Sequence, residues 1–317
     1  MFQIIGTGMY VPERIVTNDE LATMVDTNDE WIKQRVGIAE RRISTDEWTS
    51  DMAYKAALQA LENANCKPED LDYILTASVS AECVSPSTAC MVQKLLGATC
   101  PALEINAACS AFLFLLETAA GIFARKRAKK ILVVGAERLS GIMDWSDRGT
   151  CIIFGDGAGA AVLSDEENGY LDSVVTVQGN DEVIKIPHFI GCSPFFTKEA
   201  ESPYVHMMGQ ETFKYAVNAI CGDINTLLER NNLTLDDISY IVPHQANKRI
   251  IDFAAKRLKT TEDKFFVNIE HYGNTSSASV PIALDELHRS GNLKRGDYII
   301  LTAFGGGLAN AACLIRW

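Results

Sequence analysis

A cysteine lies where a turn of small residues meets a long apolar segment, in "NAACSAFLFLLETAAG", residues 106–121. The segment from residue 110 predicts a buried helix, with Cys109 at its first turn. Unpaired backbone N–H groups and the helix dipole at that end favour a thiolate, which is a nucleophile. Many free cysteines are instead small hydrophobic core residues, so this stretch alone leaves both interpretations open.

Three other segments contain residues that could take part in a reaction with the Cys109 thiol. His244 follows an apolar strand in "YIVPHQAN", at the end of a sheet where α/β proteins bind ligands. Asn274 lies in the turn of "HYGNTSSASVP", and "LTAFGGGLAN" places three glycines after a strand. A structural histidine, a helix cap and a tight turn are the alternatives. Together the segments favour thioester acyl transfer, with cysteine as nucleophile and backbone N–H groups as an oxyanion hole.

The elements that must position these residues alternate between strands and helices, which predicts an α/β fold. Residues 57–79 resemble residues 224–246, with Tyr73 under Tyr240 (240 − 73 = 167). Val133 falls under Ile300 at the same offset, and "GAGAAVLS" resembles "NAACLIRW". The pattern predicts a duplicated α/β unit whose halves bring the cysteine, histidine and asparagine segments together, although α/β proteins share such patterns in general.

Composition narrows the class of protein. The chain has 317 residues, a net charge of −12 and 47% hydrophobic residues, which argues against a protein that coats nucleic acid or an anionic membrane. Nine cysteines without a CxxC pair or zinc-ligand spacing predict free thiols in a reducing cytosol and no metal site. The N-terminus does not have a signal-peptide pattern, and no apolar run approaches the ~20 residues of a membrane span. We therefore expect a cytoplasmic protein.

Several motifs resemble those of β-ketoacyl-acyl-carrier-protein synthase III, the thiolase-fold condensing enzyme that starts fatty acid synthesis. They are "AACSAF", "DRGTCIIFGDGAGAAVL", "VPHQAN", "GNTSSASVP" and "AFGGG", and the N-terminal "TNDEWIKQRVGIAERR" is similar too. The similarity runs from Ile5 to Trp317 and is weakest between residues 178 and 205. It implies a thiolase-like αβαβα fold of duplicated halves, residues 1–170 with the cysteine and residues 171–317 with the His/Asn pair and the glycine turn.

The resemblance also implies a reaction. Cys109 would be acylated by an acyl-CoA starter, and His244 and Asn274 would bind the malonyl thioester carbonyl of malonyl-acyl-carrier-protein as carbon dioxide leaves. The enolate would then attack the acyl-cysteine in a decarboxylative Claisen condensation. The backbone N–H groups of Cys109 and Gly306 would form the oxyanion hole. No metal or bound cofactor is implied, and a homodimer is expected.

Further positions correspond to family contacts. Residues expected at coenzyme A are Trp31, Arg35, Arg148 and Asn247. Residues expected at the acyl pocket are Ser85 and Phe304. The expected dock for an acidic carrier protein is a basic cluster, for which a solvated helix face is the alternative: Lys214, Lys248, Arg249, Lys256 and Arg257.

Departures from the family pattern concern the acyl pocket. Ala111 replaces a glycine two residues after the cysteine, which would trim the pocket. Ser85 stands where well-known bacterial members have a phenylalanine that reaches into the partner subunit's pocket, so starters larger than acetyl are expected. Residues 178–210 lack the usual glycine-rich stretch and are expected to shape the far pocket wall.

Other functions remain open from the sequence. An acyltransferase of a specialised pathway would keep Cys109 but not need His244 and Asn274. A hydroxymethylglutaryl-CoA synthase would need a catalytic glutamate, for which Glu82 is in the right region but outside a matching motif. A non-catalytic paralogue could bind carrier protein alone. The starter and the pathway are not predicted.

Overall fold

Two β-sheets organise the computed structural model, which describes residues 1–187, 194–195, 197–199 and 201–317. The first sheet has the strand order β1-β7-β6-β4-β5. β1 pairs antiparallel with β7, β7 antiparallel with β6, and β6 parallel with β4. Its strands are β1 (Gln3–Tyr10), β4 (Tyr73–Ala77), β5 (Ala102–Glu104), β6 (Lys130–Glu137) and β7 (Gly157–Ser164).

The second sheet repeats the pattern of the first. Its order is β8-β13-β12-β11, again with two antiparallel pairs followed by a parallel pair. β5 at the edge of the first sheet has no counterpart among the described strands of the second. The predicted duplication is therefore confirmed at the level of strand order. The strands are β8 (Tyr170–Asn180), β11 (Ile238–Pro243), β12 (Tyr298–Gly305) and β13 (Gly307–Arg316).

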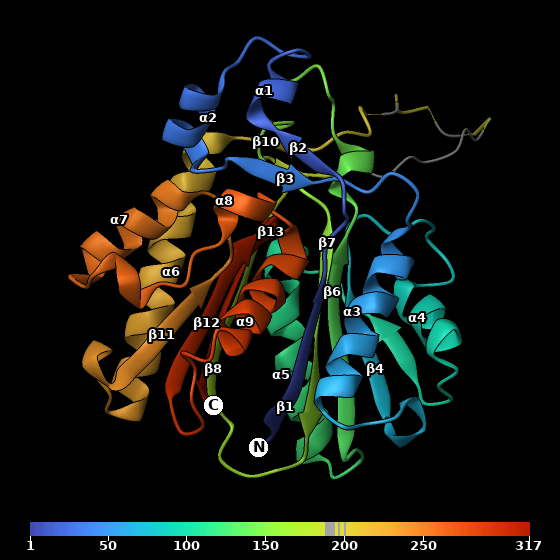
Figure 1. Cartoon of the computed structure of the whole chain (residues 1–317), viewed down its shortest axis with the longest axis vertical. Helices are drawn as coiled ribbons and strands as arrows, with labels where there is room; N and C mark the ends of the chain where they lie inside the picture. Colours follow the sequence, from blue (N-terminus) through green and yellow to red (C-terminus); the bar gives the residue numbers. More distant parts are fainter. Residues whose placement is uncertain (188–193, 196, 200) are drawn as a thin grey trace.

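Helices cover both faces of each sheet and create five layers (Figure 1). α3 (Thr49–Asn63) and α4 (Thr88–Leu96) pack on the outer face of the first sheet. α5 (Ala111–Ala124) and α9 (Ser279–Arg289) form the middle layer, where their apolar side chains join one hydrophobic cluster with strands of both sheets. The outer helices of the second sheet are α6 (Gly209–Asn231) and α7 (Lys248–Leu258). This αβαβα order is the predicted thiolase-like fold.

Shorter elements lie above one end of the sheets (Figure 1). Arg41 anchors this region from a fully buried position, because its guanidinium donates to Val16 O, Asn18 Oδ1 and Ile152 O. These bonds join the N-terminal segment to the loop before β7. The elements are β2 (Ile15–Thr17), α1 (Asn18–Leu21), α2 (Asp29–Val36), β3 (Glu40–Arg42), β9 (Ile184–Lys185), β10 (His206–Met207) and α8 (Ile269–Tyr272).

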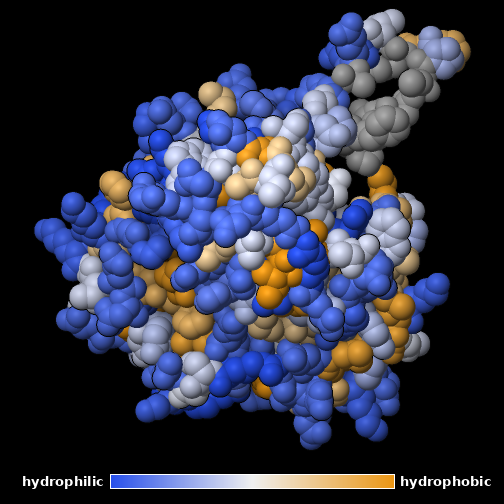
Figure 2. Space-filling model, turned by 45° about the horizontal axis from the view of Figure 1, so that its top comes forward, coloured by the Kyte–Doolittle hydropathy of each residue, from blue (hydrophilic) through white to orange (hydrophobic). Residues whose placement is uncertain are grey.

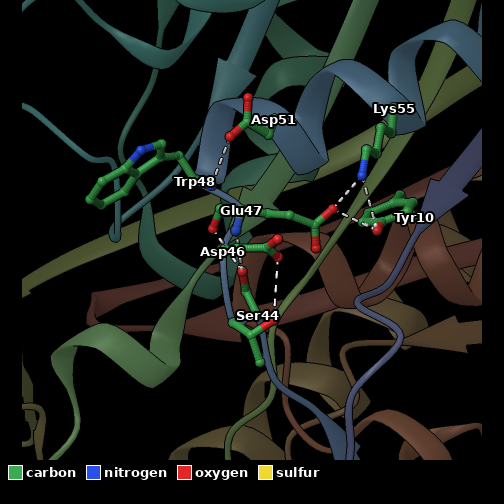
Figure 3. A network of polar contacts seen from close by, with 8 residues as sticks. Tyr10, Ser44, Asp46, Glu47, Trp48, Asp51 and Lys55 are labelled. Atoms are coloured by element: carbon green, nitrogen blue, oxygen red, sulfur yellow. Dashed lines mark hydrogen bonds and ion pairs between the residues drawn. The ribbon is translucent and has the colours of Figure 1, made fainter.

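A polar network holds the start of α3 against β1 (Figure 3). Tyr10 donates its hydroxyl to the Glu47 carboxylate at 2.6 Å, and Lys55 pairs with the same carboxylate. Asp51 accepts from the Trp48 backbone N–H at 2.9 Å, which satisfies a donor at the helix N-terminus. The exposed Trp48 ring points away from this network.

The sequence predicted free cysteines and no membrane-spanning segment. Eight cysteines are free in the described structure, and Cys192 lies outside the described residues. Within the described ranges, no helix combines the length and the apolar character that crossing a membrane would require.

Replacing Asp223 with asparagine is expected to stabilise the protein at pH 8. Asp223 is buried on α6 and accepts a hydrogen bond from Asn310 on β13, and burial raises the pKa of its carboxyl to about 6. The folded chain therefore holds this proton more tightly than the unfolded chain, and stability falls as the pH rises from about 4 to about 6. Asparagine keeps the hydrogen-bond acceptor without the charge. We expect a gain of about 2 kcal/mol in the free energy of unfolding at pH 8 and none at pH 4, measured by urea denaturation.

Candidate active site

One cavity of about 710 Å³ contains all three side chains for which the sequence predicts chemistry. Cys109, His244 and Asn274 line it together, although they come from three distant segments of the chain. Cys109 precedes α5, His244 follows β11, and Asn274 lies between α8 and α9. α5 and α9 occupy equivalent positions in the two halves, so the duplication brings these segments to one place.

Cys109 lies in the short turn Ala108–Ser110 that leads into α5. Ala108 has φ +48°, which lets the chain turn sharply before the helix. Burial raises the pKa of the Cys109 thiol to about 11. Burial and the field of the helix N-terminus act on this thiol in opposite directions, so the expected thiolate stays a prediction.

His244 is buried and neutral. Burial lowers the pKa of its imidazole to about 3, so the ring carries no charge near neutral pH. Its Nδ1 lies 2.6 Å from Ser279 Oγ, and the Gln245 N–H donates to the same oxygen at 3.4 Å. A hydroxyl that accepts from Gln245 can donate its own proton to Nδ1, which leaves the proton of the imidazole on Nε2.

Asn274 is held by its neighbours on both sides. Its backbone N–H donates to Ile153 O at 2.9 Å, and its backbone carbonyl accepts from Gly155 N at 3.0 Å. The Ser276 N–H donates to Asn274 Oδ1 at 2.8 Å. Since the carboxamide oxygen is occupied, the amide Nδ2 is the group that remains to donate into the cavity.

The glycine turn after β12 approaches the nucleophile directly. A Cβ on Gly305 would lie 2.7 Å from Cys109 N, so only glycine fits at that position. Gly305 lines the main cavity, whereas Gly306 lies near Ile184 and lines a neighbouring cavity. The oxyanion role of the Cys109 and Gly306 N–H groups stays a prediction.

The residues predicted to bind coenzyme A all line the same cavity at its outer part: Trp31, Arg35, Arg148 and Asn247. The Arg148 guanidinium lies 5.0 Å from the Trp31 ring centroid, and that of Arg35 lies 5.6 Å from it. An indole beside two cations suits a flat, negatively charged ligand such as a nucleotide. Asn247 caps α7 and donates to Arg35 O, which links α7 to α2.

Comparison with known proteins gives a consistent result. Models of 3-oxoacyl-[acyl-carrier-protein] synthase III match residues 103–179, and models of its C-terminal part match residues 228–317. The chain is 47% identical to the β-ketoacyl-[acyl-carrier-protein] synthase III of Clostridium acetobutylicum, over 99% of this chain and 98% of that one. The structure superimposes on 3-oxoacyl-[acyl-carrier-protein] synthase III from Aquifex aeolicus with a TM-score of 0.93, 43% identity and full coverage of both chains.

This chain belongs to the β-ketoacyl-acyl-carrier-protein synthase III family. A homologous synthase from Thermus thermophilus is also similar, with a TM-score of 0.92, 38% identity and 99% coverage of each chain. The protein is therefore an acyltransferase of the condensing type, and initiation of fatty acid synthesis is favoured over the alternative functions. Glu82, the candidate for a different chemistry, does not line the cavity of this synthase III.

The predicted carrier-protein dock of this synthase III lies at the cavity mouth and on α7. Lys214 and Arg249 are exposed and line the mouth beside Phe213 and Phe253. Lys256 and Arg257 are exposed on α7, and Arg257 donates to Asn218. Lys248 differs, because its ammonium pairs with Asp252 at 2.6 Å and its stem packs against Gly37.

Of the two residues predicted at the acyl pocket of the synthase, Phe304 lines this cavity and Ser85 does not. Phe304 is buried and its ring lies edge-on to the His244 ring, with 5.3 Å between centroids. Ser85 is exposed and lines neither this cavity nor its neighbour, so its role in a partner's pocket stays a prediction. Ala111 is buried in the core and does not line the cavity, so its methyl group does not trim the pocket as expected.

Residues 178–210 were predicted to shape the far wall of the acyl pocket, and some of them line the cavity. Ile184, Ile186 and Val205 are among the lining residues, so this segment does contribute to the wall. The rest of that prediction concerns residues 188–193, 196 and 200, which lie outside the described residues.

The sequence did not identify three polar residues near the nucleophile. Ser279 contacts His244, Ser276 lines the cavity, and Glu137 lies fully buried at the end of β6. Glu137 was detectable, since a glutamate that closes the apolar run "ILVVGAE" is unusual in a buried strand. Within the described residues, no group of three or more His, Cys, Asp or Glu side chains is arranged to hold a metal.

Proposed function

We propose that Cys109 accepts the acyl group of an acyl-CoA and that His244 and Asn274 promote decarboxylation of malonyl-acyl-carrier-protein. The observation that carries this proposal is that all three side chains line one cavity, which also contains the Trp31 ring and two arginines beside it. Attack of the sulfur on the thioester carbonyl forms the acyl-cysteine and releases coenzyme A. The N–H groups of Cys109 and the glycine turn are suited to the oxyanion of that step.

The His/Asn pair suits the second half of the reaction. Loss of carbon dioxide from a malonyl thioester leaves an enolate whose oxygen carries negative charge. Asn274 Nδ2 and the neutral His244 ring can both donate to that oxygen, while a carboxylate there would repel it. The enolate carbon then attacks the acyl-Cys109 carbonyl and yields a β-ketoacyl product. Both substrates are thioesters that supply their own activation, so the proposed reaction needs no metal or bound cofactor.

The two substrates share one tunnel but contact different surfaces. Trp31 and Arg148 would bind the nucleotide of acyl-CoA. The dock of Lys214, Arg249, Lys256 and Arg257 would bind the acidic carrier protein, and its positive charge is notable on a chain of net charge −12. Lys248 contributes less, since Asp252 and Glu262 already neutralise its ammonium.

Two substitutions should separate these surfaces. Trp31→Ala removes the ring and should raise the KM for acyl-CoA about tenfold, because a stacking and cation–π contact contributes about 1–2 kcal/mol. Lys256→Glu should raise the KM for malonyl-carrier protein several-fold and leave that for acyl-CoA unchanged. Steady-state kinetics with each substrate varied in turn is the measurement. Equal effects of both substitutions on both substrates would contradict separate surfaces.

We also propose a cytoplasmic homodimer. β5 is an edge strand with Leu103 37% exposed, and Val84 and Val177 are exposed apolar residues elsewhere on the surface. Figure 2 shows hydrophobic surface along the edge of the molecule on the side where α4 lies in Figure 1. A neighbouring cavity of about 640 Å³ is open beside β8, and a second subunit would close it. The free cysteines are compatible with a reducing compartment. The division into residues 1–170 and 171–317 likewise remains a proposal.

The exposed position of Ser85 leads to a prediction on starter length. If the partner subunit's pocket receives this residue, its small side chain leaves room for branched or medium-chain acyl groups. Ser85→Phe should therefore lower kcat/KM for such starters at least about tenfold and spare acetyl-CoA, since filling a pocket discriminates by about 1–3 kcal/mol. Acylation rates for a series of acyl-CoAs measure this. Wild-type activity confined to acetyl-CoA would contradict the prediction.

Mass spectrometry tests the proposed function as a whole. The protein is incubated with several acyl-CoAs, the adduct is mapped, and malonyl-carrier protein is then added. An acyl group on Cys109 that is discharged as a β-ketoacyl-carrier protein is the expected result. An adduct that only other nucleophiles discharge would support an acyltransferase of another kind. No adduct with any starter would support a non-catalytic paralogue.

A further inference from the structure

Gln245 turns away from the active site although its neighbours face it. His244 and Ala246 line the cavity, whereas Gln245 between them does not. Gln245 is nevertheless only 1% exposed. A buried carboxamide costs free energy unless its polar atoms form hydrogen bonds within the protein. The role of Gln245 therefore depends on what its carboxamide binds.

The Gln245 carboxamide makes four hydrogen bonds. Its Nε2 donates to Pro243 O at 2.8 Å and to Phe266 O at 3.1 Å. Its Oε1 accepts from the backbone N–H groups of Asn268 at 3.1 Å and Ile269 at 3.2 Å. Both donors and both acceptor sites of the amide are thus occupied. Two carbonyls on one side and two N–H groups on the other allow only this orientation of the side chain.

These bonds join the end of β11 to the start of α8. Phe266 N donates to Ile241 O at 2.9 Å, so the segment before α8 runs beside β11. β11 ends at Pro243, and beyond that point the Gln245 side chain replaces the backbone pairing. The first N–H groups of a helix have no partner within the helix, and Gln245 Oε1 binds them in α8. One side chain therefore fixes α8 against the end of β11.

The two segments that Gln245 joins lead directly to the His/Asn pair. His244 is the first residue after β11, and its backbone N–H donates to Thr302 O at 2.7 Å. α8 closes with the bond from Gly273 N to Ile269 O at 2.9 Å, and Asn274 is the next residue. The relative positions of His244 and Asn274 therefore depend on how α8 is held against β11.

α9 is bound to the same two segments. Ser279 Oγ lies 2.6 Å from His244 Nδ1 and accepts from the Gln245 backbone N–H at 3.4 Å. On the other side, Asn268 Nδ2 donates to Glu286 Oε2 at 2.6 Å. β11, α8 and α9 thus form a closed set of contacts in which the Gln245 carboxamide supplies the link between β11 and α8.

We propose that Gln245 is a positioning residue that places His244 and Asn274 so that both donate to one enolate oxygen. The inference rests on the proposed function of that pair. Gln245 does not line the cavity, so it acts through its neighbours in the chain and through α8. A misplacement of about 1 Å can reduce a rate about a hundredfold, so the four bonds matter for catalysis as well as for stability.

The test compares Gln245→Met and Gln245→Asn with the wild type. Methionine has a similar volume without the hydrogen bonds, and asparagine keeps the amide but is one methylene too short to bind both segments. Release of labelled carbon dioxide from malonyl-carrier protein is measured without a starter, and acylation of Cys109 is measured by mass spectrometry. Gln93→Asn is the matched control, because Gln93 Nε2 also donates to a backbone carbonyl, that of Cys100 at 2.6 Å, and lines neither cavity near the site.

We expect carbon dioxide release to fall at least about tenfold in both Gln245 variants, because the misplaced donors no longer reach one oxygen together. The loss should appear in kcat and leave the KM for malonyl-carrier protein unchanged, since the enolate forms only during the reaction. Acylation of Cys109 should stay within about threefold of the wild type. Combined with His244→Ala, Gln245→Asn should cost less than it does alone, because residue 244 then has no donor to misplace.

Three results would overturn the proposal. They are wild-type carbon dioxide release in either folded variant, an equal loss of acylation and decarboxylation, and a loss that simply multiplies with that of His244→Ala. If circular dichroism shows that Gln245→Met does not fold, Gln245→Asn decides between these results. An absence of any adduct on Cys109 in the wild type is distinct, because it overturns the proposed nucleophile while carbon dioxide release still decides the role of Gln245.

Discussion

Cys109→Ala is expected to abolish acyl transfer while leaving decarboxylation in place. Without the sulfur no acyl-enzyme can form, so condensation should fall at least about a thousandfold. His244 and Asn274 line the same cavity but do not need the sulfur to bind a malonyl thioester. Release of carbon dioxide from malonyl-carrier protein should therefore persist. The two activities are measured by product mass spectrometry and by labelled carbon dioxide.

Cys151→Ala is the matched control for this variant. Cys151 is a buried free cysteine that does not line the cavity, so its replacement should leave both activities close to those of the wild type. Condensation that survives in Cys109→Ala would show that another group carries the acyl chain. Loss of decarboxylation together with condensation would show that the variant has lost the shape of the site.

His244→Ala and Asn274→Ala should give the opposite result. Each substitution removes one donor to the enolate oxygen, and the loss of such a donor costs about 100- to 1000-fold in rate. Acylation of Cys109 should continue, so the acyl-enzyme should accumulate when both substrates are present. Mass spectrometry of the protein and assays of carbon dioxide release measure the two steps separately.

The pH profile sharpens this prediction. Because burial lowers the pKa of His244 to about 3, the ring stays neutral and remains a donor throughout the range from pH 5 to pH 8. Decarboxylation by Cys109→Ala should therefore show no step near pH 6.5, where an ordinary histidine titrates. A step there that disappears in His244→Ala would contradict a neutral donor. His271→Ala, an exposed histidine on α8, is the control.

Much of the fold follows from periodic patterns that local sequence carries. The repeat of residues 57–79 at 224–246 predicted the matching α3–β4 and α6–β11 units, and the strand orders of the two sheets agree with it. The motifs around Cys109, His244 and Asn274 were recognisable too, because turns and strand ends have characteristic residues. Their roles were then implied by family resemblance.

The sequence by itself determined which residue types are present and which elements carry them, because helix and strand periodicity are local properties. Only the tertiary structure decided how strongly each site residue is desolvated. Burial raises the pKa of Cys109 to about 11 and lowers that of His244 to about 3, so desolvation of the thiol acts against the field of the helix end. Likewise, the hydrogen bond of 2.7 Å from Ser277 Oγ to Glu137 Oε1 joins the turn before α9 to the end of β6. Desolvation and long-range contacts depend on every packed neighbour at once, and no short stretch of sequence contains them.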